Sequence, residues 1–159
     1  MTAMGRSDSA PFDPEWFTKE LMERGIATPE QITGCTPEEV AEVLAEKKDV
    51  SVPQAYVDFL RCAGRSAGSL FQGSDIHYPD CLGINAYAEE FARDDDPGLT
   101  TEGRFFFYVH QGYAFYFFEH GKDGVWSYVE GDGEPRKYAA TFVEFLSSQL
   151  DNATRTARR

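Results

Sequence analysis

Hydrophobic and polar positions follow two different periods along the chain. Before residue 72, apolar residues return every three or four positions, which is the spacing of amphipathic helices. The most regular example is a helix with Pro53 in its first turn and Gly64 at its end. One face of this helix collects the apolar side chains of Tyr56, Phe59, Leu60 and Ala63. The first part of the chain is therefore predicted to be mainly helical.

Capping residues predict the other helices. An aspartate followed by a proline and a glutamate predicts a helix over about residues 14–24. Thr36, followed three residues later by a glutamate, has the spacing of a capping box and predicts a helix that reaches about Lys48. The same spacing at Thr141 and Glu144 predicts the last helix of the chain.

The stretch over residues 73–102 is rich in loops but holds one more predicted helix. Asn85 can cap this helix. The helix ends at three consecutive aspartates, Asp94, Asp95 and Asp96, and carboxylates at a C-terminus oppose the helix dipole. We therefore expect this helix end to be frayed or to be held by another contact.

From residue 104 onward the pattern changes to short aromatic segments separated by glycine turns. We predict strands over residues 105–109, 113–118 and 125–130. Because their connections are short, the three strands should pair as an antiparallel meander at about residues 104–130. Two further short strands are predicted, at residues 69–72 and 136–139.

Both faces of this meander are apolar. Alternation places residues 105, 107 and 109 on one face, and Phe106 and Tyr108 on the other. Helices should therefore cover one face fully and the other partly. The sequence thus predicts an α+β fold with a central, mostly antiparallel sheet, flanked by N-terminal helices and one C-terminal helix.

The length of 159 residues predicts one domain. Small and polar residues predict disorder over residues 1–12, and a basic stretch predicts a frayed tail over residues 152–159. The single domain is expected over residues 13–151. The first residues contain neither a signal-peptide core nor a membrane span, and the three cysteines form no disulfide framework, so we expect a cytoplasmic protein.

The chain is strongly acidic, with a formal net charge of −12. This charge argues against nucleic-acid binding and against a polybasic membrane contact, which both need a positive surface. It is compatible with a basic protein partner, or with a role in solubility alone. Between Gly73 and Glu102 one base, Arg93, faces eight acids: Asp75, Asp80, Glu89, Glu90, Asp94, Asp95, Asp96 and Glu102.

The residues suggest no reaction. The three histidines have no third metal ligand at a fixed spacing, and no catalytic residue, metal site or cofactor is predicted. Cys35 precedes a helix start that could lower its pKa, but no motif supplies a base. The run of aspartates at residues 94–96 fits a solvated charge run, a partner-binding surface or a cation site. The aromatic side of the meander fits core packing or an apolar ligand.

One ordered set of residues carries a family resemblance: Val52, Pro53, Tyr56, Phe59, Leu60 and Gly64. A capped helix comes before this set, and the aromatic meander and the final helix come after it. Over about residues 30–150, this order resembles the SUKH superfamily, also described as Smi/Knr-like proteins. Two departures are visible, since Val52 stands where leucine is usual and the turn at residues 122–124 is shorter than the family's acidic turn.

The resemblance implies the same α+β fold and a role without catalysis. Many bacterial members look like immunity proteins, which bind and block a cognate toxin domain in the cytoplasm. A nuclease toxin would present a positive cleft, and an acidic protein can occupy it. We therefore expect a cognate toxin with a basic surface as the partner. A scaffold or regulatory module that binds another protein is the alternative, followed by a small-ligand-binding protein.

The candidate partner-binding residues are the acids that cluster around the predicted helix with Asn85 at its start and the loop after the meander. They are Asp75, Asp80, Glu89, Glu90, Asp94, Asp95 and Asp96, with Glu130, Asp132 and Glu134 in second place. This assignment rests on charge clustering alone. The sequence does not predict an oligomeric state.

Overall fold

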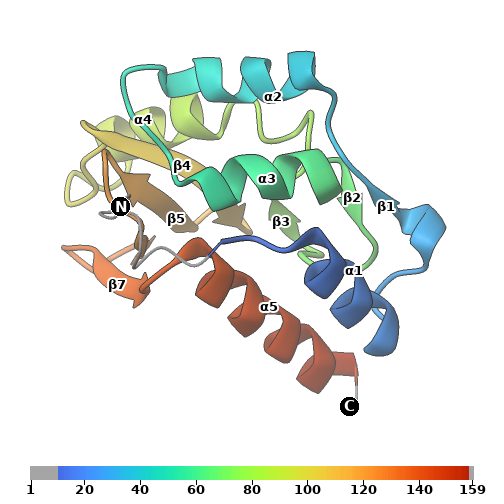
Figure 1. Ribbon diagram of the computed structural model, residues 1–159. Helices are drawn as coiled ribbons and strands as arrows, with labels where there is room; N and C mark the ends of the chain where they lie inside the picture. Colours follow the sequence, from blue (N-terminus) through green and yellow to red (C-terminus); the bar gives the residue numbers. More distant parts are fainter. Residues whose placement is uncertain (1–10, 158–159) are drawn as a thin grey trace.

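The aromatic half of the chain folds as a sheet because glycines close its turns. The computed structural model describes residues 11–157, and Figure 1 shows their arrangement. Five strands pair antiparallel in the order β3-β4-β5-β6-β7, and a separate small sheet pairs β1 with β2. At the first hairpin, Gln111 and Gly112 both take positive φ (51° and 81°), which is the geometry that such a tight turn requires. The predicted antiparallel meander is confirmed.

The helices of the described chain surround this sheet. Their bounds are α1 Pro14–Glu23, α2 Pro37–Leu44, α3 Gln54–Ala63, α4 Ile84–Asp94 and α5 Phe142–Ala157. The strands are β1 Ile32–Thr33, β2 Ser66–Ala67, β3 Ser74–Asp75, β4 Arg104–His110, β5 Ala114–Glu119, β6 Val125–Val129 and β7 Arg136–Ala139. Two 3₁₀ turns, Pro29–Gln31 and Ala45–Lys47, complete the list. The predicted α+β class, with helices before and after the sheet, is confirmed.

Both faces of the sheet are covered, and by different helices. On one face, the ring of Tyr56 from α3 packs 5.7 Å from that of Phe107, and Phe145 from α5 packs 5.2 Å from the same ring. On the other face, Phe91 from α4 lies 4.9 Å from Phe115. These aromatic side chains are buried, so the sheet forms the centre of one hydrophobic core.

A β-bulge in β4 corrects the predicted assignment of faces. The pairing of β4 with β5 shifts between Phe106 and Tyr108. Beyond the bulge, Tyr108 packs on Phe145, on the same side as Phe107. The prediction that Tyr108 shares a face with Phe106 was therefore wrong, because one extra residue in a strand reverses the alternation that follows it.

The helix starts follow the predicted capping chemistry. The side chain of Thr36 accepts a hydrogen bond from the backbone N–H of Glu39 (3.1 Å), and the Glu39 carboxylate accepts one from the Thr36 N–H (3.0 Å). The same Thr-to-Glu contact, from the Glu144 N–H to Thr141, opens α5. Pro53, however, is the N-cap of α3 rather than a residue of its first turn, so that prediction was wrong by one position.

Residues 69–72 do not form the predicted strand. They lie in a turn, in which Phe71 has a positive φ of 70°. The strands on either side of this turn are instead β2 and β3, two residues each. The turn buries Leu70 and Phe71 under α3 and α5, so their apolar character reflects core contacts rather than a sheet.

The two ends of the described chain are more structured than the sequence suggested. Phe12, within the segment expected to be disordered, is buried against Phe17 and Phe59. Residues 1–10 of that segment lie outside the described residues. At the other end, α5 continues to Ala157, into the stretch expected to be a frayed tail.

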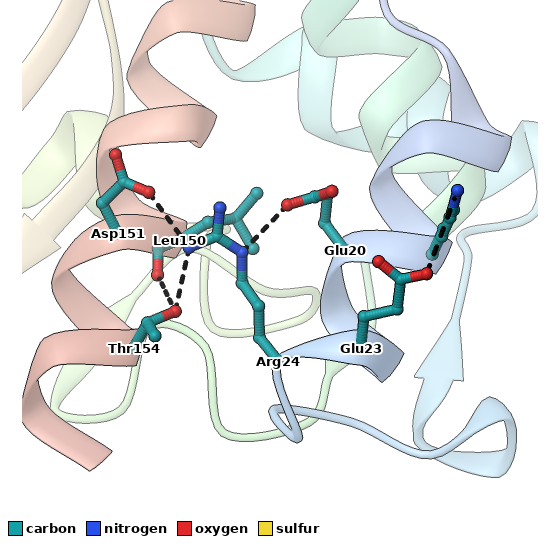
Figure 2. A network of polar contacts seen from close by, with 7 residues as sticks. Glu20, Glu23, Arg24, Leu150, Asp151 and Thr154 are labelled. Carbon is teal, nitrogen blue, oxygen red and sulfur yellow. Dashed lines mark hydrogen bonds and ion pairs between the residues drawn. The ribbon is translucent and has the colours of Figure 1, made fainter. Parts of the chain in front are cut away.

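A polar bridge joins α5 to the end of α1, and Figures 1 and 2 show the two helices side by side. Arg24 donates hydrogen bonds to Glu20 (2.9 Å), to Asp151 (3.0 Å) and to the hydroxyl of Thr154 (2.9 Å). Glu20 raises the pKa of the Arg24 guanidinium, and Asp151 adds to this effect. The bridge fastens the first helix of the described chain to the last.

The Tyr56 hydroxyl is buried without a hydrogen-bond partner in the described structure, although its ring packs on Phe105, Phe107, Phe118 and Phe142. A buried and unsatisfied hydroxyl is destabilising. Tyr56→Phe should therefore leave the free energy of unfolding unchanged or raise it by about 1 kcal/mol. Urea denaturation measures this, with Tyr56→Leu as a control that also removes the ring. A loss of more than about 1 kcal/mol on Tyr56→Phe would contradict the assignment.

Candidate functional site

A buried asparagine holds α4 against the sheet. The Asn85 side chain accepts a hydrogen bond from the Phe106 N–H (2.7 Å) and donates one to the Phe106 carbonyl (3.2 Å). Both backbone groups belong to the residue at which the β-bulge begins. The prediction that Asn85 caps the helix was wrong, since Gly83 is the N-cap, with a φ of 122°. The amide instead fixes the acidic helix to β4.

Asp96 holds the other end of α4. Its carboxylate accepts hydrogen bonds from the Tyr128 hydroxyl (2.9 Å) and from the N–H groups of Gly131 (2.9 Å) and Gly98 (3.1 Å). These bonds, with that from Gly131 first, lower the pKa of Asp96. Their contribution to stability is present above the ordinary pKa of 3.8 and is lost as the pH falls through the lowered value. This is the contact that compensates for carboxylates at a helix C-terminus.

Three more of the ten predicted acids have partners within the described chain. Asp132 accepts a hydrogen bond from the Val129 N–H (2.9 Å) and lies 3.8 Å from Arg136. The other two pairs are Glu89 with Lys47 (3.6 Å) and Asp94 with Arg93 (3.1 Å). Such contacts reduce the charge that these side chains can offer to another molecule.

The remaining six acids are exposed, and no hydrogen bond or ion pair within residues 11–157 engages their carboxylates. They are Asp75, Asp80, Glu90, Asp95, Glu130 and Glu134. Unlike the four above, they have no partner within the described residues. The structure thus divides the predicted cluster into carboxylates that support the fold and carboxylates that are free.

Tyr87 lies at the centre of this free charge. Its ring is 38% exposed, stacks on Phe115 at 5.7 Å, and is fixed by a hydrogen bond from its hydroxyl to the Gly112 carbonyl (2.6 Å). Partial burial raises the pKa of Tyr87, and the carboxylates of Asp95, Glu130 and Glu90 raise it further. Three free acids, two at α4 and one in the β6–β7 loop, therefore lie close enough to influence the pKa of this one tyrosine.

A shallow cleft of about 310 Å³ continues this surface. Tyr87, Ile84 and Val109 line it, together with the acids Asp75 and Asp80. The free acids thus come from four separate segments, and the fold brings five of the six to the surroundings of one exposed tyrosine. Glu134, in the β6–β7 loop, is not shown to be among them.

The order of these elements, from the capped α2 to the α5 helix, can now be compared with known families. The model of the SMI1 / KNR4 family (SUKH-1) matches residues 34–148. The chain belongs to this family. No curated protein gives a significant match to this chain. The matched region begins beside Cys35 and ends within α5, so it includes the whole sheet and the acidic helix.

The motif residues of this SUKH-1 domain serve the core. Tyr56, Phe59 and Leu60 are fully buried on the inner face of α3. Gly64 ends the helix with ordinary helical geometry, and its reason for being glycine is space, because a Cβ there would lie 2.5 Å from the Cys35 sulfur. Gly34 is tighter, since its Cβ would lie 1.7 Å from the Arg61 carbonyl oxygen. These residues support the fold rather than a binding surface.

Three acids of α2 and of the 3₁₀ turn that follows it differ from the free acids around Tyr87. Glu39 pairs with Arg65, Glu42 accepts a hydrogen bond from the Tyr78 hydroxyl (2.5 Å), and Glu46 accepts one from the Gly83 N–H (2.9 Å). Their charge is directed into contacts between elements. Figure 1 shows α2 beside α4, and the contacts of Glu46 and Lys47, in the 3₁₀ turn after α2, connect that turn to α4.

Groups that could carry chemistry are held in structural roles. Burial raises the pKa of Cys35 to about 11 and that of Cys81 to about 12. The expectation that a helix start could lower the Cys35 pKa was therefore wrong. For Cys81 burial is the largest cause, and the neighbouring carboxylates of Glu46 and Asp80 add to it. Within residues 11–157, no three histidine, cysteine or acidic side chains are arranged to hold a metal ion.

One serine–histidine contact was missed in the sequence. The Ser74 hydroxyl lies 2.7 Å from Nδ1 of His110, across the β3–β4 pair, and also donates to the Tyr108 hydroxyl (2.9 Å). The two residues are 36 positions apart, and no local motif connects them.

None of the described helices is long and apolar enough to cross a membrane.

Proposed function

We propose that this SUKH-1 domain is a non-catalytic protein-binding module that neutralises a cognate toxin protein in the cytoplasm. The observation that supports this proposal is the set of free carboxylates around Tyr87. Five exposed acids without partners in the described chain lie near one fixed aromatic ring. Acids that only kept a protein soluble would not need to gather around an exposed tyrosine.

The charge of the surface defines the partner. Carboxylates that no basic residue neutralises attract a positively charged protein and accelerate its association. A rigid, half-exposed tyrosine adds the kind of contact that contributes most to interface energies. Tyr87 is rigid because its ring is stacked and its hydroxyl is bonded. A partner with a basic surface and a recess for an aromatic ring fits this arrangement.

A toxin that cleaves nucleic acid has such a surface, because its active site must hold phosphates. Covering that cleft with carboxylates would exclude the substrate without any reaction. The family to which the chain belongs favours a protein-binding role of this kind. In this proposal the aspartates 94–96 contribute the charge at the end of α4. Asp96 also holds the loop that carries Glu130, because it accepts a hydrogen bond from the Gly131 N–H.

Co-expression tests this proposal. The protein should be produced together with the C-terminal domain of a toxin encoded beside its gene, in cells in which that domain alone stops growth. We expect growth to be restored and the two proteins to elute as one complex in size-exclusion chromatography. Continued growth arrest at equal expression, with no complex, would contradict the proposal.

A further inference from the structure

The opposite face of the sheet, under α5, contains a cavity of about 490 Å³. It lies between the turn at residues 69–72, the strands β4, β5 and β7, and α5. A cavity of this size is within the range that small-molecule sites occupy. It is separated by the sheet from Tyr87, which packs on the α4 face.

The lining of this cavity contains no aspartate, glutamate, lysine or arginine. In a chain with 26% charged residues, this absence distinguishes the cavity from the rest of the surface. A phosphate or carboxylate would find no lysine or arginine there, and an ammonium group would find no carboxylate. The lining therefore selects an uncharged ligand.

Three tyrosines form one wall. Tyr108 and Tyr138 each lie 5.0 Å from Tyr116, measured between ring centroids. All three rings also pack on Phe145, at 5.6 to 5.7 Å. The β-bulge in β4 is what turns Tyr108 to this side. The rings are thus held in place, and their hydroxyls are directed by the packing behind them.

Hydrogen bonds fix both ends of this wall. At one end, Ser74 connects the Tyr108 hydroxyl with His110. At the other, the Tyr138 hydroxyl is bonded to Ser148 (2.9 Å) and accepts from the Gln149 amide (3.1 Å). Between them, no hydrogen bond within the described residues engages the Tyr116 hydroxyl. Burial raises the pKa of Tyr116 to about 12, so this hydroxyl keeps its proton and can donate.

We propose that this cavity binds an uncharged ring compound whose edge carries both hydrogen-bond donors and acceptors, with the Tyr116 hydroxyl as a central contact. Hydroxyl, amide and imidazole groups can each donate and accept, so they match such an edge. The aromatic wall suits the apolar face of the ring. Nucleosides and simple saccharides share this chemistry, and the test below separates them.

Three probes are titrated separately into the ¹⁵N-labelled full chain: uridine, N-acetylglucosamine and uridine 5′-monophosphate. The signals of Gln72 and Gln149, on opposite sides of the cavity, report binding by NMR. We expect saturable shifts with at least one uncharged probe, and the probe that saturates identifies the ligand class. Tyr116→Phe should weaken this binding about three- to tenfold, as the loss of one neutral hydrogen bond does.

Ala153→Leu adds a larger side chain to the cavity wall and should weaken binding more than about tenfold. Ala41→Leu, the same change at an exposed position of α2, should leave binding unchanged. The absence of saturable shifts with both uncharged probes would overturn the proposal. Equal affinity of Tyr116→Phe and the unmodified protein would overturn the central contact, and equally tight binding of the nucleotide would overturn the selection against charge.

Discussion

Asn85→Ala should lower the free energy of unfolding by about 3 kcal/mol, because it leaves two buried backbone groups of Phe106 without partners. Each such group costs about 1–3 kcal/mol when its partner is removed. Asn85 is only 4% exposed, so water does not readily replace the amide. Urea denaturation followed by circular dichroism measures the loss. A loss below about 1 kcal/mol would show that the amide is not the anchor of α4.

Asn85→Asp is the matched variant, since it has the same shape but no donor when ionised. Burial raises the pKa of a carboxyl group above its unfolded value of about 3.9. The free energy of unfolding of this variant should therefore be closest to that of the unmodified protein below about pH 3.9, where the carboxyl group is protonated and can donate. The destabilisation by Asn85→Asp should grow as the pH rises through the raised pKa of the folded state. A difference independent of pH would contradict burial of this side chain.

Neutralising three free acids together, with Glu90→Gln, Asp95→Asn and Glu130→Gln, should weaken binding of the toxin domain about 100-fold at low ionic strength. An exposed charge contact contributes up to about fivefold, and three act together around Tyr87. Most of this difference should disappear at high salt, since salt screens exposed charges. Isothermal titration calorimetry at two salt concentrations measures both effects.

The matched control neutralises three exposed acids at the other end of the molecule, with Glu15→Gln, Glu23→Gln and Glu30→Gln. Both triple variants have the same net charge, so the comparison separates position from total charge. We expect the control to change affinity less than about threefold. Equal weakening by both variants would mean that total charge, and not this surface, determines binding. Asp96 is left intact in both, because it supports the fold.

Much of the fold was predictable because its signals are local. The capping box at Thr36 involves residues three positions apart, and the structure confirms both of its hydrogen bonds. Glycine at the β4–β5 turn predicts the hairpin because the turn needs positive φ. The apolar stripe of α3 predicts which of its residues are buried, and the structure confirms the burial of Tyr56, Phe59 and Leu60.

The errors arose where distant residues meet. The β-bulge at Phe106 leaves no signal in a segment in which every residue is apolar, yet it reverses the faces that follow. Asn85 was interpreted as a cap because caps are local, whereas its partner is 21 residues away. Residues 69–72 are apolar because helices cover them, and apolar character alone does not separate a buried turn from a strand.

The candidate site was predictable as a region but not as a set of residues. Charge counting identifies the acids, since eight of them face one base over residues 73–102. It does not show that Asp96 reaches Tyr128 across 32 residues, or that Asp132 bonds back to Val129 at the end of β6. It also misses Tyr87, whose exposure depends on the packing of α4 against β5. Free charge is a property of the folded arrangement.

The central claim is that the partner covers the acidic surface around Tyr87. The most direct measurement is hydrogen exchange of the backbone amides, compared between the free protein and its complex with the toxin domain. We predict that protection on binding is concentrated in residues 84–95 and in the β6–β7 loop, residues 130–135. Protection confined to α1 and α5, on the far side of the sheet, would contradict the account.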